Sequence, residues 1–355
     1  MNTMSDISRE LQQAVEHALQ QNTTLNITGG GSKSFYGRQP EGARLDVTGH
    51  HGIITYEPTE LVMTARCGTP LIEIEALLAE HRQMLPFEPP HFGDRATLGG
   101  AVACGLSGPR RPFSGAMRDC MLGCTLINGR AEMLTFGGEV MKNVAGYDIA
   151  RLMVGAMGTL GLLLTLSFKV LPRPAEELTV SLEMDPAEAI KTMNRWAGRP
   201  LPLSALCYDG SRVYARLCGT AESVAAAQRR LGGERLALSE RFWRTLREQQ
   251  HPFFQEKRNL WRLSVAPATP IMALPGDWLL DWGGAQRWLK SEAPAGDVFR
   301  AAETAGGHAT LFRSDDRSEE RFQPLAPALM NYHKRLKQAF DPSGLFNPKR
   351  LYSDW

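Results

Sequence analysis

Three glycine-rich segments follow one another in the first half of the chain, and they restrict its fold more than any other feature. The first, Gly29-Gly30-Gly31-Ser32, directly follows a short strand-like run at 25–28. The second extends from Gly93 to Gly100, and the third occupies 155–162. Glycines let a backbone approach a diphosphate closely and point successive N–H groups at its oxygens. One such segment alone is as typical of an ordinary turn as of a nucleotide-binding loop. Several such segments within one domain favour a dinucleotide-binding fold.

Two common nucleotide-binding designs are disfavoured by the residues around these glycines. No G-x-G-x-x-G joins a strand to a helix with an acid about 20 residues further on, so a Rossmann site for NAD is not expected. No G-x-x-x-x-G-K-[ST] occurs either, which disfavours a nucleotide kinase. The 40 basic and 38 acidic residues nearly balance, so the overall charge gives no reason to expect nucleic-acid binding.

A rigid Pro172-Arg173-Pro174 segment ends the apolar strand-like run 162–171 and marks the predicted domain boundary. Before it, apolar residues at helical spacing over 7–19 predict an amphipathic helix. Asn128-Gly129 lies between two strand-like runs and predicts a hairpin, hence a mixed sheet. Beyond the boundary, strands alternate with helices, which predicts an antiparallel sheet with helices on one face. There, Asp185-Pro186-Ala187-Glu188 predicts the start of a helix.

Cysteine usage and hydropathy indicate the compartment. The 6 cysteines contain no C-x-x-C pair and no dense framework, so free thiols in a reducing compartment are expected. The most apolar later segment, 160–171, is too short to cross a bilayer, so no transmembrane segment is predicted. The expected location is the cytoplasm, with peripheral attachment to the cytoplasmic face of the inner membrane through partners as an alternative.

The most specific pattern lies between Phe136 and Leu162. A strand is followed by K-N-x-x-G-Y-D ending at Asp148, then by a short helix and by G-x-x-G-T-L-G starting at Gly155. This order resembles the FAD domain of the vanillyl-alcohol-oxidase/cresol-methylhydroxylase superfamily. Segments at Gly108–Pro112, 281–285, 305–310 and 341–348 extend the resemblance over nearly the whole chain, to the FAD-binding E subunits of bacterial glycolate oxidases.

The resemblance implies an α+β protein with a two-subdomain FAD-binding domain at 1–174. A smaller α+β cap domain with an antiparallel sheet follows at 175–355, and its C-terminal segment returns to the FAD domain. The expected cofactor is FAD, held non-covalently, because no histidine follows the first glycine segment. The expected site residues are Gly29, Gly30, Gly31, Ser32, Gly93, Thr97, Gly99, Gly100, Lys142, Tyr147, Gly158, Thr159 and Leu160.

The implied activity is oxidation of glycolate and similar small 2-hydroxy acids, with electrons passed to a larger FAD-containing subunit and an iron–sulfur subunit. The larger catalytic relatives carry the segments H-x-G-D-G-N-x-H and E-H-G-x-G, and neither is present in this chain. Three roles therefore remain open. The chain either accepts the hydride itself, or relays electrons or supports a catalytic sister subunit, or, as a third alternative, works alone as a reductase that uses NADPH.

A few titratable residues remain as candidates for the chemistry. His91 precedes the second glycine segment and is a candidate base. Arg110 and Arg111, in a proline-flanked loop, are candidates to contact the flavin or a substrate carboxylate, and are expected at the flavin-facing edge of the domain interface, with a solvated turn as the alternative. His50 is expected at the surface, and His308 to make a structural hydrogen bond. No metal site is expected.

Overall fold

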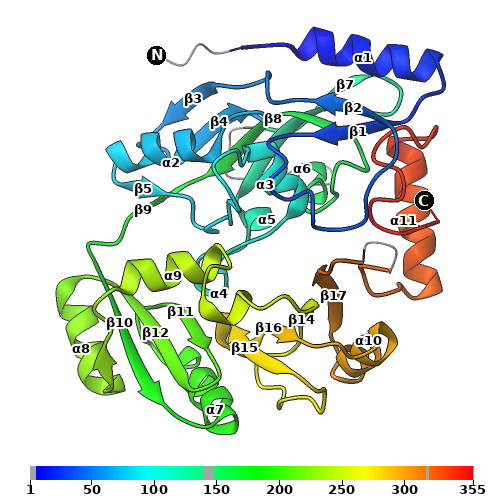
Figure 1. Ribbon diagram of the computed structural model, residues 1–355. Coiled ribbons are helices and arrows are strands. Elements are labelled where there is room, and N and C mark those ends of the chain that lie inside the picture. Colours follow the sequence, from blue (N-terminus) through cyan, green and yellow to red (C-terminus); the bar gives the residue numbers. More distant parts are fainter. Residues whose placement is uncertain (1–4, 139–147, 317–319, 355) are drawn as a thin grey trace. The chain divides into compact units, whose positions relative to one another are not determined.

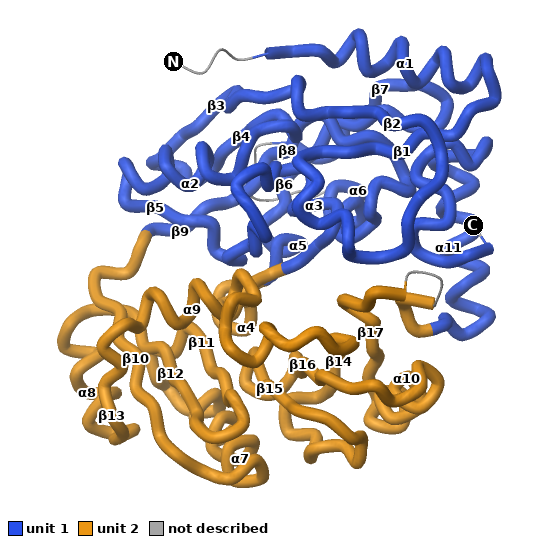
Figure 2. Tube along the Cα trace, in the orientation of Figure 1, with its two compact units in different colours: residues 1–106, 116–172, 324–355 blue, residues 107–115, 173–323 orange. Residues whose placement is uncertain are grey.

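The computed structural model describes residues 5–138, 148–316 and 320–354, which belong to two compact units (Figures 1 and 2). Unit 1 comprises 1–106, 116–172 and 324–355, and unit 2 comprises 107–115 and 173–323. The segment 107–115, which precedes the expected boundary in sequence, is therefore part of the second unit. The C-terminal segment belongs to the first unit.

The main sheet of unit 1 is antiparallel along all of its described strands, in the order β3-β4-β8-β6-β7. The Asn128-Gly129 hairpin is confirmed, since it joins β6 to β7. The expected mixed sheet is wrong, because parallel pairing occurs in a separate ribbon, β1-β2. The strands are β1 (Leu25–Thr28), β2 (Ala43–Asp46), β3 (Ile53–Glu57), β4 (Val62–Arg66), β5 (Gln83–Met84), β6 (Met121–Ile127), β7 (Met133–Gly137), β8 (Leu162–Lys169) and β9 (Leu171–Pro172).

Helices cover this sheet and supply its core. Ile74 of α2 and Val102 of α3 are fully buried with Met63 and Phe168 of the sheet, and each such side chain contributes about 1.5–3 kcal/mol on burial. Leu11 and Val15 of the amphipathic α1 pack in a second cluster with β1 and the C-terminal segment. The helices are α1 (Ser8–Gln20), α2 (Leu71–Glu80), α3 (Leu98–Cys104), α5 (Met117–Cys120), α6 (Ile149–Leu152) and α11 (Pro327–Phe340).

Unit 2 is built on one large antiparallel sheet, in the order β13-β10-β12-β11-β15-β16-β14-β17. Its strands are β10 (Glu176–Glu183), β11 (Leu203–Tyr208), β12 (Arg212–Gly219), β13 (Glu234–Arg235), β14 (Leu260–Ser264), β15 (Asp277–Asp281), β16 (Gln286–Lys290) and β17 (His308–Arg313). Its helices are α4 (Arg111–Ser114), α7 (Pro186–Ala197), α8 (Ala221–Leu231), α9 (Ser239–Arg247) and α10 (Ala295–Thr304), with 3-10 turns η1 (Pro252–Phe254) and η2 (Trp282–Gly284).

The helices of unit 2 lie on both faces of this sheet, although one face was expected. Ile190 of α7 and Val224 of α8 pack with Val180 of β10. Thr179, the residue before Val180 in that strand, points to the opposite face, where its Oγ1 accepts a hydrogen bond of 2.8 Å from Trp243 Nε1 of α9. The amphipathic pattern of α9 indicates a helix but does not specify which sheet face it covers.

The start of α7 forms as its sequence predicts. The Asp185 carboxylate accepts hydrogen bonds of 3.0 Å from the N–H groups of Ala187 and Glu188, and Pro186 occupies the first turn. Such a cap stabilises a helix by about 1 kcal/mol. Among the described residues, no helix is long and apolar enough to span a membrane.

Candidate cofactor site

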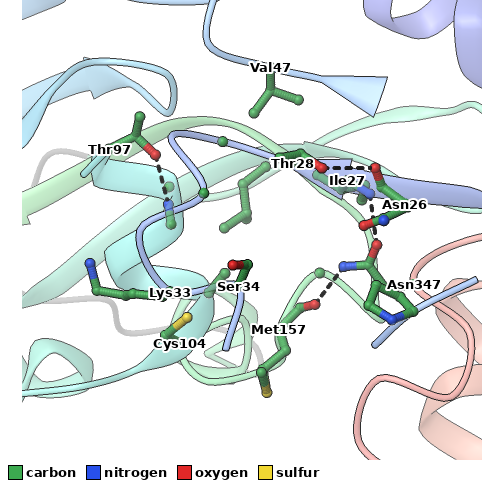
Figure 3. Close-up of a pocket in the computed structure, with 18 of the residues that line it drawn as sticks. Asn26, Ile27, Thr28, Lys33, Ser34, Val47, Thr97, Cys104, Met157 and Asn347 are labelled. Carbon is green, nitrogen blue, oxygen red and sulfur yellow. Dashed lines mark hydrogen bonds between the residues drawn. The ribbon is translucent and has the colours of Figure 1, made fainter. Parts of the chain in front are cut away.

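A cavity of about 310 Å³ opens in unit 1 beside the end of β1 (Figure 3). Cofactor sites commonly have volumes of about 300–1,000 Å³. It is lined by the loop after β1, by α3, by the start of β8 and by the C-terminal segment. The lining residues include Asn26, Thr28, Gly29, Gly30, Gly31, Ser32, Lys33, Ser34, Arg44, Thr97, Gly99, Gly100, Cys104, Met157, Gly158, Asn347 and Arg350.

The loop after β1 presents unused backbone donors to this cavity. The N–H groups of 29–32 donate no hydrogen bond to any residue that the structure describes. Gly31 has φ of +73°, and a Cβ built on it would meet no atom within 4 Å. Successive N–H groups around such a left-handed residue form a concave site for an anion. The loop therefore has the geometry to hold a diphosphate.

The N-terminus of α3, which follows the expected site residue Thr97, does not supply such donors. Gly99 N–H donates to Cys67 O at 2.8 Å, and Leu98 N–H donates to a carbonyl at 2.9 Å. Gly100 N–H donates to the Thr97 side chain at 3.2 Å (Figure 3). These groups are already used, so Thr97 caps the helix.

Two glycines of the first segment are also required for packing between loops. A Cβ on Gly30 would lie 1.4 Å from the carbonyl oxygen of Arg95, and one on Gly29 would lie 2.7 Å from Thr97 Oγ1. Glycine is thus required at Gly30 because the two loops pack directly against each other. Among the three glycines of the first segment, Gly31 is the one where the missing side chain leaves open space.

The cavity carries positive charge. Its lining contains Lys33, Arg350 and Arg44, the last of which pairs with Asp46 at 2.8 Å, and none of the described lining residues is acidic. Lys33 is buried, and its ammonium donates to His91 O at 3.2 Å and to Ser32 Oγ at 3.4 Å. Burial raises the pKa of the Cys104 thiol, and the charges of Lys33 and Arg350 oppose that shift. This potential suits an anionic group.

Asn347 connects the two ends of unit 1 at the cavity wall. Its Oδ1 accepts a hydrogen bond of 2.8 Å from Ile27 N–H, and its Nδ2 donates to Met157 O at 2.7 Å (Figure 3). Gly158, the next residue after Met157, has φ of +71°, and a Cβ there would meet Asn347 Nδ2 at 2.6 Å. The C-terminal segment therefore positions both β1 and the third glycine segment.

A buried ion pair holds that segment in place. Lys337 Nζ of α11 donates to Asp341 Oδ2 at 2.6 Å, to Thr159 O at 2.7 Å and to Phe346 O at 3.0 Å. The Asp341 carboxylate also accepts from the N–H groups of Leu345 and Phe346. Burial lowers the pKa of Lys337, and the charge of Asp341 opposes this effect. The pair links α11 to the turn that carries Gly158.

The structure brings together some of the expected site residues and not others. The cavity is lined by Gly29, Gly30, Gly31, Ser32, Thr97, Gly99, Gly100 and Gly158, but not by Gly93, His91, Thr159 or Leu160. Leu160 packs in the hydrophobic core. Lys142 and Tyr147 lie outside the described residues. Lys33, Asn347 and Arg350 also line the cavity, although none of them was an expected site residue. Asn347 lies in the segment 341–348, whose family resemblance is the one sequence signal that could have indicated it.

Arg110 and Arg111 lie in unit 2, in the loop that leads into α4. The buried Arg110 guanidinium donates to Glu177 Oε2 at 2.7 Å and contacts Cys218 Sγ at 3.4 Å. The guanidinium of Arg111 lies 4.3 Å from the ring centre of Trp282. Arg110 is thus neutralised within its own unit, and its expected role beside the flavin stays a prediction.

Two histidines differ from what was expected of them. His50 is buried rather than exposed, and its Nδ1 accepts a hydrogen bond of 3.3 Å from Ile7 N–H. This contact requires an unprotonated Nδ1, and burial lowers the pKa of His50 despite the opposing charge of Asp6. The ring of His308 makes no hydrogen bond to any described residue, so the expected structural bond is not formed.

Comparison with known proteins identifies the cofactor domain. A family model described as "FAD binding domain" matches residues 7–137. These residues include the unused N–H groups and the positive charge of Lys33. Residues 7–137 therefore form an FAD-binding domain.

Full-length similarity is found with the glycolate oxidase subunit GlcE of Escherichia coli, which is 52% identical over 98% of each chain. A D-lactate dehydrogenase of Anaerostipes hadrus is 31% identical over 45% of this chain and 32% of its own length. The glycolate oxidase subunit GlcD of Bacillus subtilis is 28% identical over 49% of this chain and 37% of its own. The chain thus spans about a third of these two larger relatives.

The fold is shared with alkyldihydroxyacetonephosphate synthase. A solved structure of that protein aligns with a TM-score of 0.65 at 14% identity, over 98% of this chain and 75% of the other. At this identity the likeness concerns the fold alone. It confirms the expected α+β fold.

Proposed function

Because this chain belongs to the family of glycolate oxidase E subunits, we propose that it serves as the FAD-binding subunit of a complex that oxidises glycolate and similar 2-hydroxy acids. The observation that carries the proposal is the set of unused N–H groups at 29–32 beside a cavity whose described lining includes cations but no acid. When bound, FAD supplies the two-electron acceptor that oxidation of an alcohol requires.

The residues of the cavity have distinct tasks in this proposal. The N–H groups of 29–32 hold the diphosphate, whose charge is balanced by Lys33 and Arg350. Asn347 keeps the β1 end and the Gly158 turn at a fixed separation, so that the donors are in place before the cofactor arrives. Preorganised donors avoid the entropy cost of ordering a loop on binding.

The hold on the cofactor is non-covalent in this proposal. The described lining residues include no histidine, and Cys104 is a thiol whose pKa is raised by burial, which makes it a poor nucleophile. Acid precipitation of the purified chain is expected to release FAD into the supernatant. Flavin that stays with the pellet would contradict this point.

Lys33 gives a direct test of the cavity assignment. Lys33→Met removes a buried charge from the site and is expected to weaken FAD binding about tenfold or more, whereas Lys33→Arg is expected to keep most of it. Lys334→Met, at an exposed position of α11, is the matched control. Equal FAD affinity in all of these variants would contradict the proposal that FAD binds in this cavity.

The proposal leaves substrate oxidation to the assembled complex. The chain lacks the histidine segments of the larger catalytic relatives, and it spans about a third of the length of those that it matches. We therefore place it beside a larger FAD-containing subunit and an iron–sulfur subunit, in the cytoplasm or at the cytoplasmic face of the inner membrane through those partners. Bleaching of the flavin by glycolate in the isolated chain would instead assign oxidation to this subunit.

Association is tested separately from chemistry. A tagged chain expressed in its native cell is expected to co-purify with both partners. The purified complex is expected to catalyse glycolate-dependent reduction of an artificial electron acceptor. A chain that is fully active alone and recovers neither partner would contradict the proposed complex. Flavin reduction by NADPH in the isolated chain would favour the reductase alternative.

A further inference from the structure

One face of the unit 2 sheet collects polar side chains from β14, β16 and β17. Arg262 pairs with Trp288 on one neighbouring strand and with Thr310 on the other. Ser264 pairs likewise with Gln286 and His308. Residues two apart in a strand share a face, as do residues directly opposite each other, so Arg262, Ser264 and His308 project to the same side.

The other face of these strands is apolar. Trp261 and Leu263 of β14 are buried with Leu311 of β17 and Val298 of α10. The polar side chains therefore do not point into the core of unit 2. They form a surface, which we call the Arg262 face and define as Arg262, Ser264 and His308.

The side chain of Arg262 is a half-buried cation. Its guanidinium makes no hydrogen bond or ion pair with the residues at 5–138, 148–316 or 320–354. Its guanidinium lies 5.9 Å from the ring centre of Trp282, against which the Arg111 guanidinium also lies, at 4.3 Å. Two positive charges beside one indole attract an anion more strongly than either charge alone.

Hydrogen bonds fix the position of Trp282, the residue that both arginines contact. Its Nε1 donates to Gly108 O at 2.9 Å, and its backbone N–H donates to Asp281 Oδ1 at 2.7 Å. Its φ of +54° is unusual for a bulky residue, which indicates that the surrounding contacts determine its position. Asp281, an acid near this face, also accepts a hydrogen bond from Gln286.

His308 supplies a neutral polar group beside the cation. It lies diagonally across the strand pair from Arg262, a separation on the order of 7–8 Å in antiparallel sheets. Although His308 is an exposed residue, partial desolvation and, secondly, the charge of Arg262 lower its pKa. The ring is therefore neutral at pH 7, with one nitrogen that donates and one that accepts.

We propose that the Arg262 face binds a small 2-hydroxy carboxylate, with the carboxylate on the guanidinium of Arg262 and the 2-hydroxyl group at His308. The planar fork of arginine matches the two oxygens of a carboxylate. The neutral imidazole can exchange a hydrogen bond with a hydroxyl group. The anion site follows from the geometry of unit 2, whereas the choice of a 2-hydroxy acid rests on the proposed function.

The test uses the full purified chain and a ligand that cannot be oxidised. The compound 2-hydroxy-2-methylpropanoate has no hydrogen on its α-carbon, so its binding is measured by calorimetry without turnover. The wild-type chain is expected to bind it with a Kd below about 1 mM, and the uncharged amide of the same acid much more weakly. Absence of saturable binding, or equal binding of inorganic phosphate, would overturn the proposal.

Three variants assign the contacts. Arg262→Gln is expected to weaken binding on the order of tenfold or more, and Arg262→Lys, which keeps the charge, to give an intermediate value. Arg300→Gln, at an exposed position on α10, is the matched control and should bind like the wild type. Equal affinity in Arg262→Gln and Arg300→Gln would overturn the role of Arg262.

The hydroxyl contact is tested by comparing two acids. The wild-type chain is expected to prefer 2-hydroxy-2-methylpropanoate over 2-methylpropanoate roughly three- to tenfold, and His308→Leu to lose this preference while still binding both acids. An unchanged preference in His308→Leu would refute the contact. Acid-released FAD is measured in every sample, because loss of FAD with intact carboxylate binding would refute the cofactor proposal and leave the Arg262 face standing.

Discussion

Replacing Lys337 by methionine removes the cation that holds the C-terminal segment against the rest of unit 1. The side chain keeps nearly the same length, but three acceptors lose their shared donor: the Asp341 carboxylate and the carbonyl groups of Thr159 and Phe346. The Asp341 side chain has no exposed surface, so its charge is left buried with only two backbone N–H groups.

The expected cost follows from that burial. Breaking a buried ion pair on one side costs about 3–5 kcal/mol, because the remaining charge stays desolvated without its partner. Lys334→Met, on the same helix, breaks a pair with Asp354 of the same 2.6 Å length, but both of those side chains are about half exposed. An exposed pair contributes about 0–1 kcal/mol. The two variants therefore isolate the effect of burial.

Two optical signals report the two units separately. Six of the 7 tryptophans, Trp196, Trp243, Trp261, Trp278, Trp282 and Trp288, lie in unit 2, and the seventh, Trp355, is replaced by phenylalanine in every variant of this experiment. Tryptophan fluorescence then follows unit 2, whereas fluorescence of FAD released on heating follows unit 1. Lys337→Met is expected to lower the flavin-release midpoint by about 6–20 °C and to leave the tryptophan midpoint nearly unchanged.

A second substitution checks the electrostatic reasoning. Asp341→Asn keeps an oxygen for one N–H group but removes the charge, so the double variant Lys337→Met/Asp341→Asn is expected to lose less stability than the sum of the single changes. A flavin-release midpoint of Lys337→Met within error of that of Lys334→Met would refute the argument.

Three further outcomes are expected. Gly30→Ala forces a methyl group onto the Arg95 carbonyl and should lower FAD affinity at least about tenfold in equilibrium binding, whereas Gly296→Ala, where a Cβ meets open space, should not. The pKa of His50 is lowered from 6.5 in the folded chain, so neutral His50 stabilises the fold fully above pH 6.5, and this stabilisation is lost as the pH falls through the folded pKa. The free energy of unfolding should therefore be lower at pH 5.5 than at pH 7.5, and this difference should be smaller in His50→Gln. Arg110→Gln should destabilise unit 2 by about 1.5–3 kcal/mol, seen as a lower midpoint of the tryptophan fluorescence transition. An unchanged midpoint would contradict the stabilising pair of Arg110 with Glu177.

Patterns that depend on adjacent residues predict the fold well. The strand at 25–28, the hairpin at Asn128-Gly129 and the helix start at Asp185 form where the sequence indicates, because each is fixed by groups a few residues apart. The family resemblance adds the cofactor and the two-part architecture. Neither source shows which sheet face α9 covers, since that depends on packing between elements far apart in the chain.

The candidate site is harder to predict for the same reason. A glycine motif does not reveal whether its missing side chain faces open space, as at Gly31, or another loop, as at Gly30. The start of α3 has the sequence of an anion site, but its donors are used by carbonyls of 67–69. Asn347 is 320 residues from its partner Ile27, a distance that no local pattern spans.

That separation has a consequence for how the protein is made. All of unit 2 is synthesised between Ile27 and Asn347, so the wall of the cavity cannot close while the ribosome is still producing the second unit. Contacts between such distant residues also form slowly, because a long chain must be brought together first. Cofactor loading is therefore a late event in biogenesis, and a nascent first unit has to survive with its glycine loop open until the final segment arrives.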